Sequence, residues 1–300
     1  MASDTTTIWQ GIEVTTPASW EMLRFGSRRE RGACSFSDEF AERLQLSWAR
    51  EAERPDFERL ISDLRAKYET EYADDPGEDP PPDFLDLPAY DHWHGLVIIE
   101  GEKHTTRAAR YFPETQALVE MTFLWEASRD DSVEHKVLQS VKVHMPSERQ
   151  RWKAFGIDAE IPGDLRLSAC KCLPGDAQLS FAGRRSLPSV TIRRMAFPSV
   201  WLKEPLGNWL LNQLPGRSRV QTRNSVATSA GHSVEQIVSI RSRGSLGFLL
   251  GLRITRLNQA CLCPREQRVY HVATDARREA TRLVSLRCEC GSLLAPQNTF

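Results

Sequence analysis

The amino-acid sequence repeats one pattern at a constant spacing of 145 residues. A Gly-Ile pair followed by a proline occurs twice, as Gly11-Ile12 with Pro17 and as Gly156-Ile157 with Pro162. The same spacing relates Phe36 to Phe181, Leu138 to Leu283, Ser140 to Ser285 and Val143 to Cys288. A spacing that is kept from one end of a unit to the other is typical of a duplicated domain. We therefore expect two copies of one fold, at residues 1–147 and 152–300.

Length and charge agree with two domains. Each copy has the size of a common domain, which is large enough to bury a core. Residues 1–150 contain 17 Lys and Arg against 30 Asp and Glu, a net charge of −13, whereas residues 151–300 contain 22 against 10, a net charge of +12. Opposite charges favour docking of the two halves on each other, and they equally favour binding of the basic half to nucleic acid or to an acidic protein.

Hydrophobic periodicity predicts the same order of elements in both copies. In the first copy we expect strands at 8–14, 34–36 and 44–48, a helix at 57–68, strands at 96–99, 108–112 and 117–125, and a helix at 132–139. In the second copy we expect strands at 156–161, 178–181 and 190–194, a helix at 201–214, strands at 235–240, 249–257 and 268–273, and a helix at 277–285. Loops are expected at 69–88, with a mobile acidic stretch at 74–82, and at 216–233. The predicted fold class is α+β, with two tandem antiparallel sheets that each pack against helices.

This pattern resembles the PsbP-like α/β/α fold, whose relatives include the DcrB and Eag-type chaperone families. In the first copy the resemblance depends on Pro17-Ala18-Ser19-Trp20, on Phe36, on the strand at 44–48 and on Val137-Leu138-Gln139-Ser140. The second copy has Pro162-Gly163-Asp164-Leu165 and lacks the tryptophan. The resemblance implies a non-enzymatic adaptor or chaperone-like module that binds another protein within a complex.

Six of the seven cysteines form three C-x-C pairs, all in the second copy. Residues i and i+2 of a strand point to the same face, so one pair offers two thiolates to a metal ion, and two pairs complete a tetrahedral zinc site. The best predicted set is Cys261, Cys263, Cys288 and Cys290. The alternatives are a disulfide or redox pair, and ordinary buried thiols without metal. Asp91-His92-Trp93-His94 is a further metal candidate, although no third ligand is marked for it.

Several arginines in or near the predicted strands of the second copy alternate with Leu, Ile and Val, and they predict a basic surface that binds a partner. They are Arg241, Arg243, Arg253, Arg256, Arg265 and Arg268. Such a surface suits an acidic protein, including the first copy itself, or a nucleic-acid backbone.

The sequence contains neither a nucleophile elbow nor a phosphate-binding glycine loop, so we expect no enzyme. The start of the chain has no secretory pattern, and the longest apolar stretch, near 246–252, is too short to span a bilayer. We therefore expect a cytoplasmic protein without membrane contact.

Overall fold

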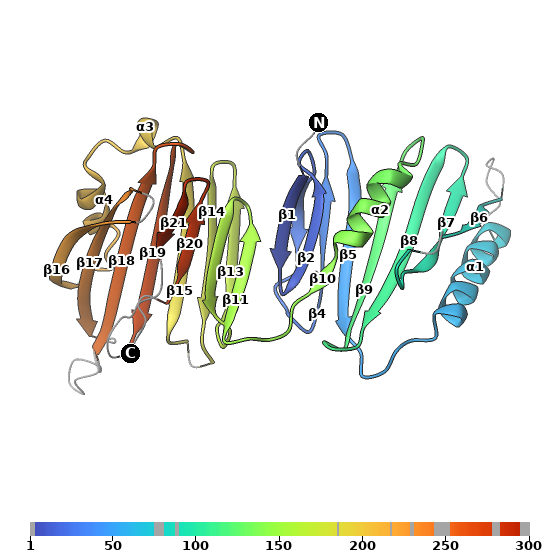
Figure 1. The fold of residues 1–300 in the computed structure, drawn as a ribbon, viewed down its shortest axis with the longest axis horizontal. Coiled ribbons are helices and arrows are strands. Elements are labelled where there is room, and N and C mark those ends of the chain that lie inside the picture. The colour runs from blue at the N-terminus through green and yellow to red at the C-terminus, as the bar shows by residue number, and fades with distance from the viewer. Residues whose placement is uncertain are drawn as a thin grey trace. The chain divides into compact units, whose positions relative to one another are not determined.

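The computed structural model describes residues 4–74, 81–87, 90–184, 186–216, 218–228, 231–242, 253–277 and 283–294. The chain divides into two compact units, Met1–Met145 and Pro146–Phe300. Each unit consists mainly of antiparallel strands, as the ribbon in Figure 1 shows. Within the described residues, no helix is long and apolar enough to cross a membrane.

The first unit contains a large and a small sheet. The large sheet has the order β3 (Glu21–Phe25), β4 (Arg31–Ser37), β5 (Glu42–Arg50), β9 (Ala117–Trp125), β8 (Lys103–Phe112), β7 (His94–Glu100) and β6 (Asp83–Asp86). The small sheet has the order β10 (Lys142–Val143), β2 (Ile12–Pro17) and β1 (Asp4–Trp9). The helices are α1 (Phe57–Asp74), between β5 and β6, and α2 (Asp131–Ser140), between β9 and β10.

The second unit repeats this arrangement. Its large sheet has the order β13 (Arg166–Leu173), β14 (Asp176–Ala182), β15 (Ser189–Ala196), β19 (Arg268–Ala276), β18 (Arg253–Cys263), β17 (Ser233–Ser242) and β16 (Arg219–Ala227). Its smaller group has the order β11 (Arg149–Ala154), β12 (Ile157–Pro162), β20 (Ser285–Cys288) and β21 (Gly291–Leu294). The helices α3 (Pro198–Trp201) and α4 (Leu206–Asn212) follow β15, where α1 follows β5 in the first unit.

The duplication extends to the register of strand pairing. Lys142 pairs with Glu13 in the first unit, and Arg287 pairs with Asp158, each 145 residues later, in the second. Phe36 and Phe181 lie on the equivalent strands β4 and β14, and both are 1% exposed. The 145-residue spacing in the sequence therefore reflects one topology that occurs twice.

The core of each unit lies between its two sheets. Strand β5 shows the alternation that this requires, because Leu44, Leu46 and Trp48 are buried while Gln45 is exposed. Trp9 of the small sheet meets Phe25 of the large sheet edge-on, with ring centroids 5.2 Å apart. In the second unit, Trp152 and Phe181 are likewise 5.0 Å apart. The opposite face of each large sheet carries α1 in the first unit and α4 in the second.

The predicted α+β class is wrong, because the structure is predominantly antiparallel sheet. The described residues contain four helices, and only α1 and α2 are longer than seven residues. The predicted helix at 201–214 is two short helices, α3 and α4. Conversely, the predicted loop at 216–233 contains the nine-residue strand β16. Eight residues of β16 are exposed, so no apolar alternation marks it as a strand.

The predicted acidic loop at 69–88 is shorter than expected. Helix α1 continues to Asp74, and β6 occupies Asp83–Asp86, because the strand pairs its backbone with β7. Most of the stretch at 74–82 lies outside the described residues, as do 249–252 of a predicted strand and 278–282 of the last predicted helix. Ser285, the predicted end of that helix, begins β20.

Candidate metal centre

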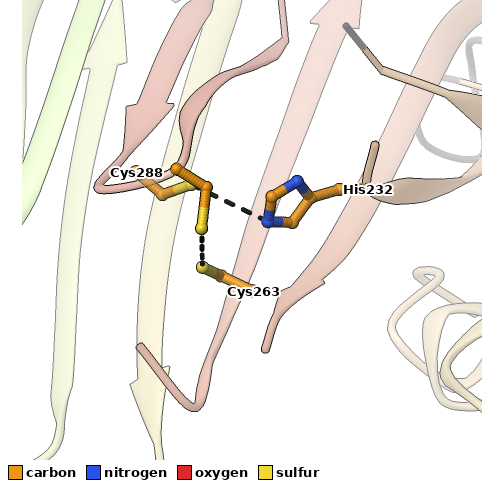
Figure 2. Close-up of side chains that lie close together, drawn as sticks. His232, Cys263 and Cys288 are labelled. Atoms are coloured by element: carbon orange, nitrogen blue, oxygen red, sulfur yellow. Dashed lines mark hydrogen bonds between the residues drawn. The ribbon is translucent and has the colours of Figure 1, made fainter. Parts of the chain in front are cut away.

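Four side chains of the second unit converge where four of its strands begin or end. Cys263 is the last residue of β18, and Cys288 is the last residue of β20. Cys290 follows in the turn before β21, and His232 directly precedes β17. Figure 2 shows the side chains of His232, Cys263 and Cys288 pointing toward one another. Strand pairing joins β17 to β18 in the large sheet and β20 to β21 in the smaller group, and the packing of these two groups brings together residues that are up to 58 positions apart in the sequence.

The ligand atoms of His232, Cys263, Cys288 and Cys290 all lie within 4.8 Å of one another. The Sγ atoms of Cys263 and Cys290 are 3.7 Å apart, and Cys288 Sγ lies 4.0 Å from His232 Nε2. His232 is 6% exposed and Cys263 is fully buried, whereas Cys288 and Cys290 are half-buried. A sulfur separation of 3.7 Å is far longer than a disulfide bond, and all the cysteines are free. These four residues can hold a metal ion.

Backbone geometry and a buried carboxylate position the ligands. His232 follows Gly231, which has a φ of +75° and donates its N–H to Thr228 O in a tight turn. The Cys288–Cys290 turn is held by Glu266, whose Oε1 accepts the backbone N–H of Glu289 at 2.8 Å. The other oxygen, Oε2, accepts the hydroxyl of Tyr270 at 2.6 Å. Glu266 therefore connects the loop between two ligands to the β18–β19 turn.

The surroundings of the buried thiols oppose their ionisation while no cation is bound. Burial, together with the neighbouring cysteines, raises the pKa of Cys261 and of Cys288 to about 12. A bound cation has the opposite effect, because a coordinating thiol loses its proton.

The predicted and observed groups share three residues. Cys261, the fourth predicted ligand, is 2% exposed on β18, but its sulfur is not among the four clustered atoms. His232 is present instead, and it belongs to none of the motifs that predict a metal ligand. In the antiparallel pair β17–β18, Val234 lies opposite Cys261. Two residues further along this register, His232 lies opposite Cys263. A predicted hairpin register was therefore the signal that could have found His232.

The other candidate ligands lie elsewhere. Cys170 and Cys172 are on β13, where Cys170 pairs with Leu179, and Cys34 is a buried side chain of β4 that pairs with Leu46. In the first unit, His94 stacks on Phe57 with ring centroids 4.3 Å apart.

The first unit does not repeat the ligand set. By strand register, the positions equivalent to His232 and Cys263 are Asp91 and Phe112. By the 145-residue spacing, the positions equivalent to Cys288 and Cys290 are Val143 and Met145. Among the described residues, the cluster therefore occurs in the second unit alone.

The predicted arginine surface is largely engaged within its own unit. Arg256 and Arg241 both contact Asp275, at 2.7 and 3.6 Å, and Arg265 lies 3.6 Å from Glu289. The guanidinium of Arg268 lies 5.4 Å from the ring centroid of Phe197. Arg253 is exposed, and Arg243 lies outside the described residues. Binding of nucleic acid or of an acidic protein by these side chains stays a prediction.

Comparison of the sequence with protein-family models and with curated proteins gave no match. The resemblance to PsbP-like domains therefore stays an expectation from the sequence pattern.

Proposed function

We propose that this protein is a non-catalytic binding protein whose second unit is stabilised by one structural Zn²⁺. The observation that carries this proposal is the convergence of one histidine and three cysteines, with all four ligand atoms within 4.8 Å of one another. Three thiolates and one imidazole form a common structural zinc set, and soft thiolate ligands favour zinc over magnesium or calcium.

The distances support this metal. Tetrahedral coordination with Zn–S bonds of about 2.3 Å separates two sulfur ligands by about 3.8 Å. The distance from Cys263 Sγ to Cys290 Sγ is 3.7 Å. The same geometry separates sulfur from nitrogen by about 3.6 Å, so the 4.0 Å between Cys288 and His232 needs only a small closure on binding. With four protein ligands, the metal keeps no open position for a substrate, which is typical of a structural site.

The position of the cluster explains what the metal would stabilise. Residues 283–294 contain only two four-residue strands, β20 and β21. Their metal ligands would connect this short hairpin to β18 of the large sheet and to the turn before β17. Because such a cross-link forms in the folded chain and not in the unfolded one, the free energy of metal binding adds to the free energy of folding.

Elemental analysis of the full chain, purified without a histidine tag, tests the proposal. We expect about one zinc per chain of the wild type. The variants His232→Ala and Cys290→Ser should each lose the zinc, while their circular dichroism spectra show that the chain stays folded. The double variant Cys170→Ser/Cys172→Ser is the matched control, because it removes a C-x-C pair outside the cluster, and it should keep the metal. Wild-type protein with almost no zinc after refolding in excess Zn²⁺ would contradict the proposal.

A second observation supports the binding role. Strand β16 is the edge of its large sheet, and its nine residues are exposed except for half-buried Val226. An exposed edge strand presents backbone N–H and C=O groups to which a partner can add a strand. We therefore propose β16 as the surface where another protein binds.

Affinity capture from the native host tests this role with two variants at Gln221. This residue lies at the irregularity between the pairs Val220–Ser239 and Thr222–Val238, where proline is tolerated but removes an N–H donor. Gln221→Pro should lose a partner that the wild type and Gln221→Ala both retain, with an unchanged melting temperature. Capture of the same proteins by all three chains would exclude β16 as the binding edge.

A further inference from the structure

A cavity of about 350 Å³ lies between α1 and the outer face of the large sheet in the first unit. Four apolar side chains of α1, Phe57, Leu60, Ile61 and Leu64, line one wall with helical spacing. The opposite wall is the sheet, where Glu120 lies between Ser47 and Ala109 of the neighbouring strands, and Ala33 lies on the strand beyond Ser47. The volume is at the lower end of the range of pockets that bind small molecules, about 300 to 1,000 Å³.

The second unit contains a filled version of the same place. One row of paired residues crosses five strands of the first unit, in the order Ala33, Ser47, Glu120, Ala109 and His94. The equivalent row of the second unit is Gln178, Arg193, His271, Ala260 and Glu235. Larger side chains therefore replace Ala33 and Ser47, and a histidine replaces Glu120.

A tryptophan covers the row in the second unit. The ring of Trp209, from α4, lies 5.5 Å from the ring of His271, and Leu210 of the same helix packs on Ile237 and Ala260. His271 is consequently 7% exposed, whereas its counterpart Glu120 is exposed. The first unit thus has space at the position where the second has an indole ring from its own chain.

The charges of the cavity favour a cationic ligand. Among the described residues, Glu120 accepts one hydrogen bond, from Ser47 Oγ at 2.9 Å, which leaves acceptor capacity for another donor. The other strong charge, Arg107, is directed to α1, where Nη2 donates to the hydroxyl of Tyr68 at 3.3 Å. Residues 1–150 have 17 basic against 30 acidic side chains, and this excess attracts cations to the first unit.

We propose that this cavity binds a small organic amine with a flat apolar body. The ammonium group forms a charge-assisted hydrogen bond with the carboxylate of Glu120. The apolar body packs against Phe57, Ile61 and Leu64 of α1, at the place that is equivalent to that of Trp209 in the second unit. This site is independent of the metal centre.

Isothermal titration of the full chain with tryptamine tests the site, because this probe joins an indole ring to an ammonium group. We expect saturable binding of one tryptamine, and no binding of indole-3-propionate, which has the same ring and the opposite charge. Glu120→Gln should weaken tryptamine binding by about tenfold, since a charge-assisted hydrogen bond becomes a neutral one. Glu126→Gln, at an exposed carboxylate outside the cavity lining, is the control and should bind as the wild type does.

Ser47→Arg provides a second variant, which fills the cavity and places a guanidinium opposite Glu120 while the carboxylate itself is kept. It introduces the residue that the second unit has at the equivalent position, Arg193, and it should abolish binding while the melting temperature is kept. Equal binding of tryptamine and indole-3-propionate, unchanged affinity in both cavity variants, or no saturable tryptamine binding would overturn the proposal.

Discussion

His271 is a buried histidine in a positively charged environment. Burial, with Arg193 and Arg256 nearby, lowers its pKa from 6.5 to about 4. Its Nε2 lies 3.4 Å from Asn258 Oδ1, under the ring of Trp209. The folded protein therefore contains the neutral imidazole at neutral pH, and protonation favours the unfolded chain.

We predict a loss of stability on acidification that depends on this residue. Because the folded pKa is below the unfolded value, the stability is fully present above pH 6.5 and falls as the pH decreases toward about 4. The loss should reach about 3 kcal/mol relative to His271→Phe, which keeps the aromatic contact but does not titrate. Urea unfolding of both chains at several pH values measures this difference. Parallel curves of unfolding free energy against pH would show that His271 does not contribute to the pH dependence of stability. The control variant His104→Phe should have the same pH dependence as the wild type.

The β1–β2 and β11–β12 hairpins turn in the same way. Gln10 and Gly11 have φ values of 54° and 85°, and Phe155 and Gly156 have 53° and 72°. Two consecutive positive φ values are typical of the type I′ turn, whose twist matches the strands that it connects. The surroundings of the two glycines differ, because a Cβ on Gly156 would lie 2.5 Å from the guanidinium carbon of Arg194. A Cβ on Gly11 would meet its nearest atom at 3.5 Å.

We predict that Gly156→Ala destabilises the protein more than Gly11→Ala does. Both substitutions place an L side chain at positive φ, which costs about 1 to 2 kcal/mol. Gly156→Ala also displaces Arg194, which contacts Tyr270 and Glu266 near the metal ligands, so its total cost should be about 1 kcal/mol larger. Chemical denaturation of both variants gives the comparison. Equal losses would mean that Arg194 moves aside without cost.

At the scale of the whole molecule, each unit has its own buried core, and the metal cluster belongs to the second. We therefore predict that chelation of the metal affects the two units unequally. Hydrogen exchange should become faster in β17, β18, β20 and β21, and it should stay unchanged in β4, β5 and β9. Mass spectrometry of the full chain with and without chelator measures this, and added Zn²⁺ should restore protection. A uniform increase in exchange over both units would contradict a local metal effect.

The sequence by itself determined the duplication and the principal elements with an apolar face. The alternation Leu44, Leu46, Trp48 and the helical stripe of α1 are local patterns, since each follows the period of its own element. Helix α2 is likewise marked locally, because its N-cap Asp130 accepts the N–H of Val133 at 3.0 Å. The spacing of 145 residues is a property of the sequence and needs no structure.

Only the tertiary structure decided the fold class and the composition of both sites. Strand β16 has an exposed, polar sequence and forms because β17 offers it backbone partners, which no local pattern records. His232 joins the cysteines because the register of the β17–β18 hairpin sets it opposite Cys263. The cavity beside Glu120 exists because no side chain of α1 fills the place that Trp209 of α4 fills in the second unit. Strand pairing and side-chain packing join residues far apart in the sequence, so their outcome depends on the whole fold rather than on neighbouring positions.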